Sequence, residues 1–125
     1  MKNILILYGG IGDTIMAYEC LVNFHVDKIY ANKIVANTLI ALECEIPIKI
    51  FPLTIGPRFI DKFKYLYSLI ILFFNLLREG KCRIAIPSFS TFWKFFPFLN
   101  ISILEKKHKR ISRNKAINLL FQKCY

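Results

Sequence analysis

The stretch that decides the fold of this 125-residue chain is Ile4–Asp13, which reads ILILYGGIGD. Its first five residues, 4–8, form a short apolar run that is typical of a strand buried on both faces of a parallel sheet. Three glycines then allow a tight turn and let a ligand approach the backbone: Gly9, Gly10 and Gly12. Asp13 or Thr14 can cap the helix expected at about 13–25. The stretch therefore predicts a strand, a glycine turn and a helix with a carboxylate at its N-terminus.

The glycine turn on its own is compatible with two interpretations. It is not the dinucleotide-binding fingerprint, because Ile15 occupies the third glycine position. It is not a Walker A loop either, because no Gly-Lys-Ser or Gly-Lys-Thr follows. The turn is then either an ordinary strand-to-helix connection with Asp13 as a helix cap, or part of a site in which Asp13 is catalytic.

Apolar runs and amphipathic segments alternate along the rest of the chain. The apolar runs predict strands at about 3–8, at 29–31 or 34–36, at 46–51, at 83–86 and at 101–104. The amphipathic segments predict helices at about 13–25, 38–43, 59–79, 92–99 and 113–125. Strands that alternate with helices indicate an α/β fold, with a Rossmann-like parallel sheet and flanking helices in one domain over residues 1–125.

The longest expected helix, at about 59–79, carries large apolar residues at helical spacing. They are Phe59, Phe63, Leu66, Tyr67, Ile70, Phe74 and Leu77. The stretch Tyr65–Leu77 has few polar groups, but it is shorter than the ~20 residues that a membrane span needs. We expect this apolar stripe to be buried between the sheet and its neighbours, with contact in the plane of a membrane as the second interpretation.

The charge of the chain is concentrated in its second half. Residues 1–62 carry six basic and six acidic side chains, whereas residues 63–125 carry twelve basic and two acidic ones, for a net charge of +10. Such a half attracts anions, which include phosphorylated glycolipids and membrane surfaces, although a solvated basic face is the plain alternative. Aromatic residues at 92–98 suit either core packing or an interdomain or membrane-interface patch. We do not expect nucleic acid as a partner, because the sequence carries no nucleic-acid-binding signature.

The cysteines and the N-terminus point to the cytoplasm. Cys20, Cys44, Cys82 and Cys124 lack metal-binding spacing, so we expect reduced thiols and no metal site. The first apolar run stops at Gly9, before any cleavage site of a signal peptide. We therefore expect a cytoplasmic protein, with peripheral contact to the inner face of the cytoplasmic membrane as an open alternative.

The stretch ILILYGGIGDTIM, residues 4–16, resembles the opening of the heptosyltransferase-like enzymes of glycosyltransferase family 9. The resemblance is clear over about the first 25 residues and looser, by the order of elements, over the rest. It implies the N-terminal, acceptor-side half of a GT-B architecture, in which two Rossmann-like domains face each other. The C-terminal, donor-binding domain is then absent from these 125 residues.

The resemblance also implies an activity and a set of site residues. The activity is inverting transfer of a sugar from a nucleotide-diphosphate donor, commonly ADP-heptose, to a lipopolysaccharide core or similar glycan, without cofactor or metal. The proposed general base falls on Asp13. The surrounding residues expected to contact substrate are Gly9, Gly10, Gly12 and Thr14, through close backbone approach and N–H groups. We expect the chain to be inactive alone, and the alternative function is a non-catalytic basic module that binds anionic glycolipid or a membrane surface.

Overall fold

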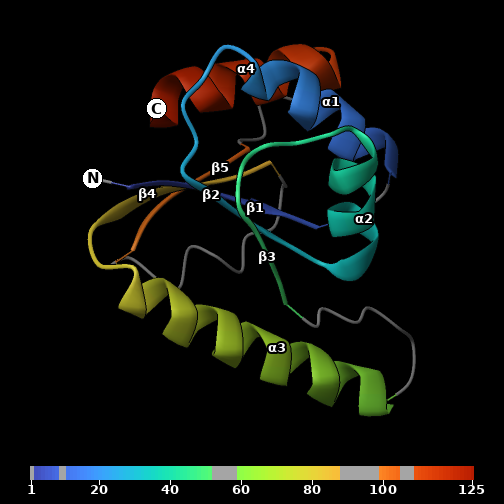
Figure 1. Cartoon of the computed structure of the whole chain (residues 1–125), viewed down its shortest axis with the longest axis vertical. Helices are drawn as coiled ribbons and strands as arrows, with labels where there is room; N and C mark the ends of the chain where they lie inside the picture. The colour runs from blue at the N-terminus through green and yellow to red at the C-terminus, as the bar shows by residue number, and fades with distance from the viewer. Residues whose placement is uncertain (1, 9–10, 52–58, 88–98, 105–108) are drawn as a thin grey trace.

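The computed structural model describes residues 2–8, 11–51, 59–87, 99–104 and 109–125. These residues form a parallel sheet flanked by helices (Figure 1). The strands are β1 (Lys2–Leu7), β2 (Lys28–Ala31), β3 (Ile48–Ile50), β4 (Cys82–Ile86) and β5 (Asn100–Ile103). The helices are α1 (Ile11–Leu21), α2 (Lys33–Ala41), α3 (Phe59–Arg78) and α4 (Arg113–Cys124). The expected α/β fold is confirmed.

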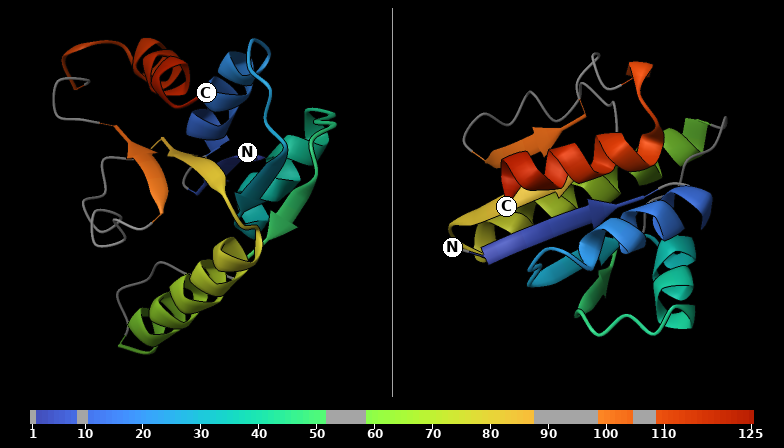
Figure 2. Two further views of the ribbon diagram at one scale, coloured as in Figure 1. Left: turned by 90° about the vertical axis from the view of Figure 1, so that its left-hand side faces the viewer. Right: turned by 90° about the horizontal axis from the view of Figure 1, so that it is seen from above.

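The sheet has five parallel strands in the order β3-β2-β1-β4-β5, with β1 at its centre. A doubly wound sheet arranges its first five strands in this order. Successive side chains of a strand point to opposite faces, so β1 supplies two cores. Leu5 and Leu7 pack beneath α1, α2 and α4, whereas Ile4 and Ile6 pack against α3. Figure 2 shows the three helices on one face of the sheet and α3 alone on the other.

The three-helix face is closed by α4. The Phe121 ring packs edge-on against Phe24, with 5.7 Å between the ring centroids. The Tyr125 hydroxyl donates a hydrogen bond to the backbone carbonyl of Ile4, and burial raises the pKa of this phenol. The last helix is thus attached to the central strand of the sheet.

The bounds of α3 agree with the expected helix at 59–79, but the prediction of which side of this helix packs on the sheet is wrong. The side chains that pack on the sheet are Leu69, Leu72 and Leu76. The apolar stripe expected to be buried, which includes Phe63 and Phe74, is exposed instead. The helix carries apolar residues on two opposite sides, and periodicity cannot tell which of two such stripes faces a sheet. Gly80, at φ 77°, ends the helix as expected for a left-handed C-terminal residue.

Other expected boundaries need correction. Of the two positions considered for the second strand, 29–31 lies in β2, whereas 34–36 is helical. Those residues belong to α2, which begins well before residue 38 because the Asn32 side chain accepts a hydrogen bond from the Val35 N–H and caps the helix. The first helix spans Ile11–Leu21 rather than 13–25. The helix expected at 92–99 falls, except for its last residue, outside the described residues.

The amino ends of the central strands are joined by a carboxylate. Glu79, which follows α3, accepts hydrogen bonds from Lys2 Nζ (3.0 Å), Lys28 Nζ (2.7 Å) and the Tyr30 hydroxyl (2.8 Å). The Lys28 ammonium also lies 5.3 Å from the centroid of the Tyr30 ring. These contacts, chiefly that of Lys28, lower the pKa of Glu79 to about 2. The Glu79 cluster therefore ties β1 and β2 to the end of α3.

Candidate functional site

The candidate site lies at the carboxyl edge of the sheet, where β1 leads into α1. The strands β2 and β3 lie on one side of β1, and β4 and β5 lie on the other. The boundary between β1 and β4 is therefore the topological switch point of the sheet. In open α/β sheets, ligands bind outside the carboxyl ends of the strands at such a point. The end of β1 at Leu7, the start of α1 at Ile11 and Pro87 after β4 meet at this edge.

Asp13 lies in the first turn of α1, at this edge. It is the third residue of the helix, so the expectation that Asp13 or Thr14 caps it is wrong. The helix starts earlier than its apolar pattern indicates, because Ile11 and Gly12 are already helical. The Asp13 side chain is 54% exposed and is thus accessible to a substrate. A negative charge in the first turn also interacts favourably with the helix dipole.

Arg113, the first residue of α4, connects this carboxylate to β4. Its Nε atom lies 3.7 Å from Asp13 Oδ1, and its Nη2 atom donates a hydrogen bond to the Pro87 carbonyl at 3.2 Å. One guanidinium thus bridges the first turn of α1 and the residue that follows β4. In the sequence, Arg113 only extends the basic run at 106–110, which reads KKHKR, and no local pattern pairs it with a carboxylate one hundred positions away.

The other expected site residues have different environments. Gly12 lies in α1, and a Cβ atom added there would meet nothing within 4 Å. Packing therefore does not require a glycine at this position. Thr14 as a whole is only 2% exposed, so neither its side chain nor its backbone offers surface to a substrate. Gly9 and Gly10 lie outside the described residues.

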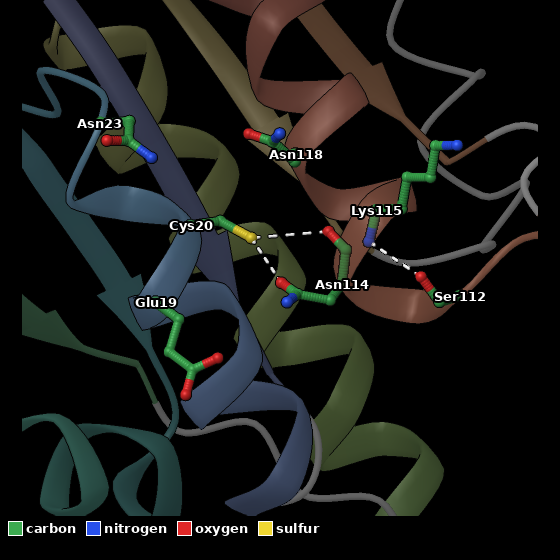
Figure 3. A pocket seen from close by; sticks show the side chains of 7 residues that line it. All are labelled: Glu19, Cys20, Asn23, Ser112, Asn114, Lys115 and Asn118. Atoms are coloured by element: carbon green, nitrogen blue, oxygen red, sulfur yellow. Dashed lines mark hydrogen bonds between the residues drawn. The ribbon is translucent and has the colours of Figure 1, made fainter.

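A polar groove of about 360 Å³ lies between α1 and α4 (Figure 3). Its lining residues are Glu19, Cys20, Asn23, Ser112, Asn114, Lys115 and Asn118. The groove lies beside the C-terminal part of α1, whereas Asp13 lies in its first turn. None of the expected site residues lines the groove. The sequence contains no motif that marks it, because its two walls come from opposite ends of the chain.

The thiol in the groove is not an activated nucleophile. Cys20 Sγ lies 2.9 Å from Asn114 Oδ1 and 3.5 Å from the Asn114 backbone carbonyl. Burial raises the pKa of Cys20, and the nearby Glu19 carboxylate raises it further by a smaller amount. The thiol therefore stays protonated at neutral pH. Both contacts are those of an S–H donor that attaches α1 to α4.

Metal binding and membrane crossing have no support in the described residues. Nowhere in the described ranges do three His, Cys, Asp or Glu side chains gather in a group that could hold a metal ion. Within the same ranges, no helix combines the length and the apolar character needed to cross a bilayer. The four cysteines carry free thiols.

Comparisons with known proteins add no family to this description. The chain shows no significant match to any protein-family model, to any curated protein or to any solved structure. The geometry at the carboxyl edge of β1 and the resemblance of residues 4–16 are therefore the grounds for a functional assignment.

Proposed function

We propose that the carboxyl edge of β1 is the acceptor-side site of a GT-B-type, sugar-transferring enzyme similar to glycosyltransferase family 9. One observation carries the proposal. Asp13 places an exposed carboxylate in the first helical turn after the central strand, at the switch point of a doubly wound sheet. The resemblance assigns the general base to the same residue. The substrates are a nucleotide-diphosphate sugar such as ADP-heptose and a glycan or glycolipid acceptor.

Asp13 acts as the general base in this scheme. It takes the proton of an acceptor hydroxyl while that oxygen forms a bond to the anomeric carbon of the donor. The bond between the anomeric carbon and the diphosphate oxygen breaks, and the nucleoside diphosphate leaves with the electron pair. Asp13 lies in the first turn of α1, and the Arg113 guanidinium lies 3.7 Å from its Oδ1 atom. Carboxylates are weak bases in general, so the positioning of the two substrates supplies much of the rate enhancement.

Two neighbouring groups position the reaction. Arg113 holds Asp13 beside the Pro87 carbonyl, which orients the carboxylate relative to the end of β4. The backbone N–H groups of the first turn of α1 point out of the helix end, where they suit phosphate oxygens. Gly12 leaves open space beside this turn, so a substrate can approach the backbone closely.

The test is sugar transfer by the full translation product of the gene, with ADP-heptose as donor and a lipopolysaccharide core oligosaccharide as acceptor. We expect Asp13→Asn to lower kcat by roughly 100-fold or more, with little change in the KM of the acceptor, because only proton transfer is lost. Glu19→Gln is the matched control, since Glu19 is another exposed carboxylate on α1. Full activity of Asp13→Asn would remove Asp13 as the base.

A further inference from the structure

The helix α3 presents a second apolar side that the described chain leaves uncovered. Its inward side packs on the sheet through residues such as Leu72 and Leu76. Its outward side carries eight large hydrophobic side chains, each between 46% and 72% exposed. These residues, called the outward stripe below, are Phe59, Ile60, Phe63, Leu66, Tyr67, Ile70, Phe74 and Leu77. In Figure 1 and Figure 2, α3 lies alone at the border of the molecule.

The outward stripe is too large to be ordinary exposed surface. A large aromatic side chain carries roughly 150–250 Å² of surface. Eight large side chains that are about half exposed in one row therefore exceed the few hundred Å² of contiguous apolar surface usual on a soluble monomer. The stripe is thus a surface built for contact with a partner.

Charge around the outward stripe selects the kind of partner. At 3.6 residues per turn, the exposed Lys62 and Lys64 fall on opposite borders of the stripe, and the exposed Arg78 ends the helix. The one acidic residue of α3, Asp61, is half-buried on the inward side. Glu79 is engaged in its own cluster. Two copies of the stripe would bring like charges together, whereas an anionic partner complements them.

We propose that the outward stripe of α3 docks into the interface of a bilayer that contains anionic lipids, with the helix lying in the membrane plane. Aromatic and aliphatic side chains with lysines at their borders suit the boundary between headgroups and acyl chains. The ridge of a single helix also matches a flat, deformable surface. The docked face is opposite the face that carries α1 and α4, so Asp13 stays accessible. The proposal rests on α3 alone and is independent of sugar transfer.

The experiment is flotation of the chain with phosphatidylcholine vesicles that contain or lack phosphatidylglycerol, at low and at physiological salt. We expect binding to the anionic vesicles only. The double variant Phe63→Ser/Phe74→Ser should lower the partition coefficient by about tenfold or more, because both rings lose their burial in the interface. Lys62→Gln/Lys64→Gln should weaken binding and reduce its dependence on salt.

Matched controls separate the stripe from general stickiness and from misfolding. Val22→Ser and Ile40→Ser remove side chains that are at least as exposed, 77% and 63%, from the opposite face, and should leave binding unchanged. Thermal unfolding followed by circular dichroism checks that each variant is folded. Three results would each overturn the proposal: no binding to anionic vesicles at low salt, unchanged binding of Phe63→Ser/Phe74→Ser, or a dimer in light scattering that this variant dissociates. The last result would assign the stripe to a second copy of the chain.

Discussion

Two carboxylates at opposite edges of the same sheet have opposite environments. Glu79, at the amino edge, is 11% exposed and accepts three hydrogen bonds. Asp13, at the carboxyl edge, is 54% exposed and has one guanidinium at 3.7 Å. A carboxylate that accepts several hydrogen bonds from its own protein has a structural role, whereas an exposed carboxylate at a switch point is accessible to a substrate. The comparison predicts that stability depends on Glu79 and that chemistry depends on Asp13.

Removal of Glu79 should have the largest effect on stability. Glu79→Ala leaves the Lys28 ammonium and the Tyr30 hydroxyl without their shared acceptor, so we expect a loss of about 3 kcal/mol in the free energy of unfolding. Asp13→Ala should change it by less than about 0.5 kcal/mol, because exposed ion pairs contribute little. Urea denaturation measures both. Equal losses for the two variants would show that the contrast between the two edges is unfounded.

Acid should remove the stabilisation that Glu79 gives to the amino edge of the sheet, in a defined pH range. The pKa of Glu79 is lowered to about 2 in the folded protein, from an ordinary value of 4.5. The carboxylate therefore contributes its full stability above about pH 4.5, and this contribution is lost as the pH falls from 4.5 towards 2. Glu79→Gln should remove most of the slope in this range when unfolding is measured at a series of pH values. In Glu79→Gln, a smaller dependence of the unfolding free energy on pH should remain from Asp27, because the Asn3 N–H donates a hydrogen bond to Asp27 and lowers its pKa.

The sequence predicts local structure better than it predicts which distant residues meet. The run 4–8 and the glycine turn correctly indicate a buried strand followed by a helix, because both signals lie within a few residues. The contact of Glu79 with Lys2 and that of Arg113 with Asp13 span most of the chain, and no periodicity encodes them.

The two sides of α3 show a further limit of sequence-based prediction. Phe63 and Phe74 follow the helical repeat as regularly as Leu72 and Leu76. Helical periodicity identifies each apolar stripe but does not show which stripe is buried and which is exposed. The packing of the other elements decides which side of α3 faces the sheet. The polar groove between α1 and α4 was missed for a related reason, since Asn114 and Glu19 become neighbours only in the folded chain.

The pair Asp13–Arg113 offers a finer test of the carboxyl edge. Arg113→Gln should lower the free energy of unfolding by about 1 kcal/mol, because its hydrogen bond to the Pro87 carbonyl is lost. In a double-mutant cycle with Asp13→Asn, we expect a coupling energy below about 1 kcal/mol, since the pair is partly exposed and 3.7 Å apart. A coupling of several kcal/mol would make Asp13 a structural carboxylate like Glu79 and would weaken its assignment as a base.

Gly12 should give the smallest effect and the clearest separation of stability from function. Glycine is a poor helix residue, and a Cβ atom at this position meets nothing within 4 Å. Gly12→Ala should therefore raise the free energy of unfolding by roughly 0.5–1 kcal/mol. If substrate approaches the first turn of α1 closely, the same methyl group will raise the KM for that substrate while the protein becomes more stable. A stabilised variant with unchanged kinetics would show instead that Gly12 serves no ligand, and it would move the substrate away from this turn.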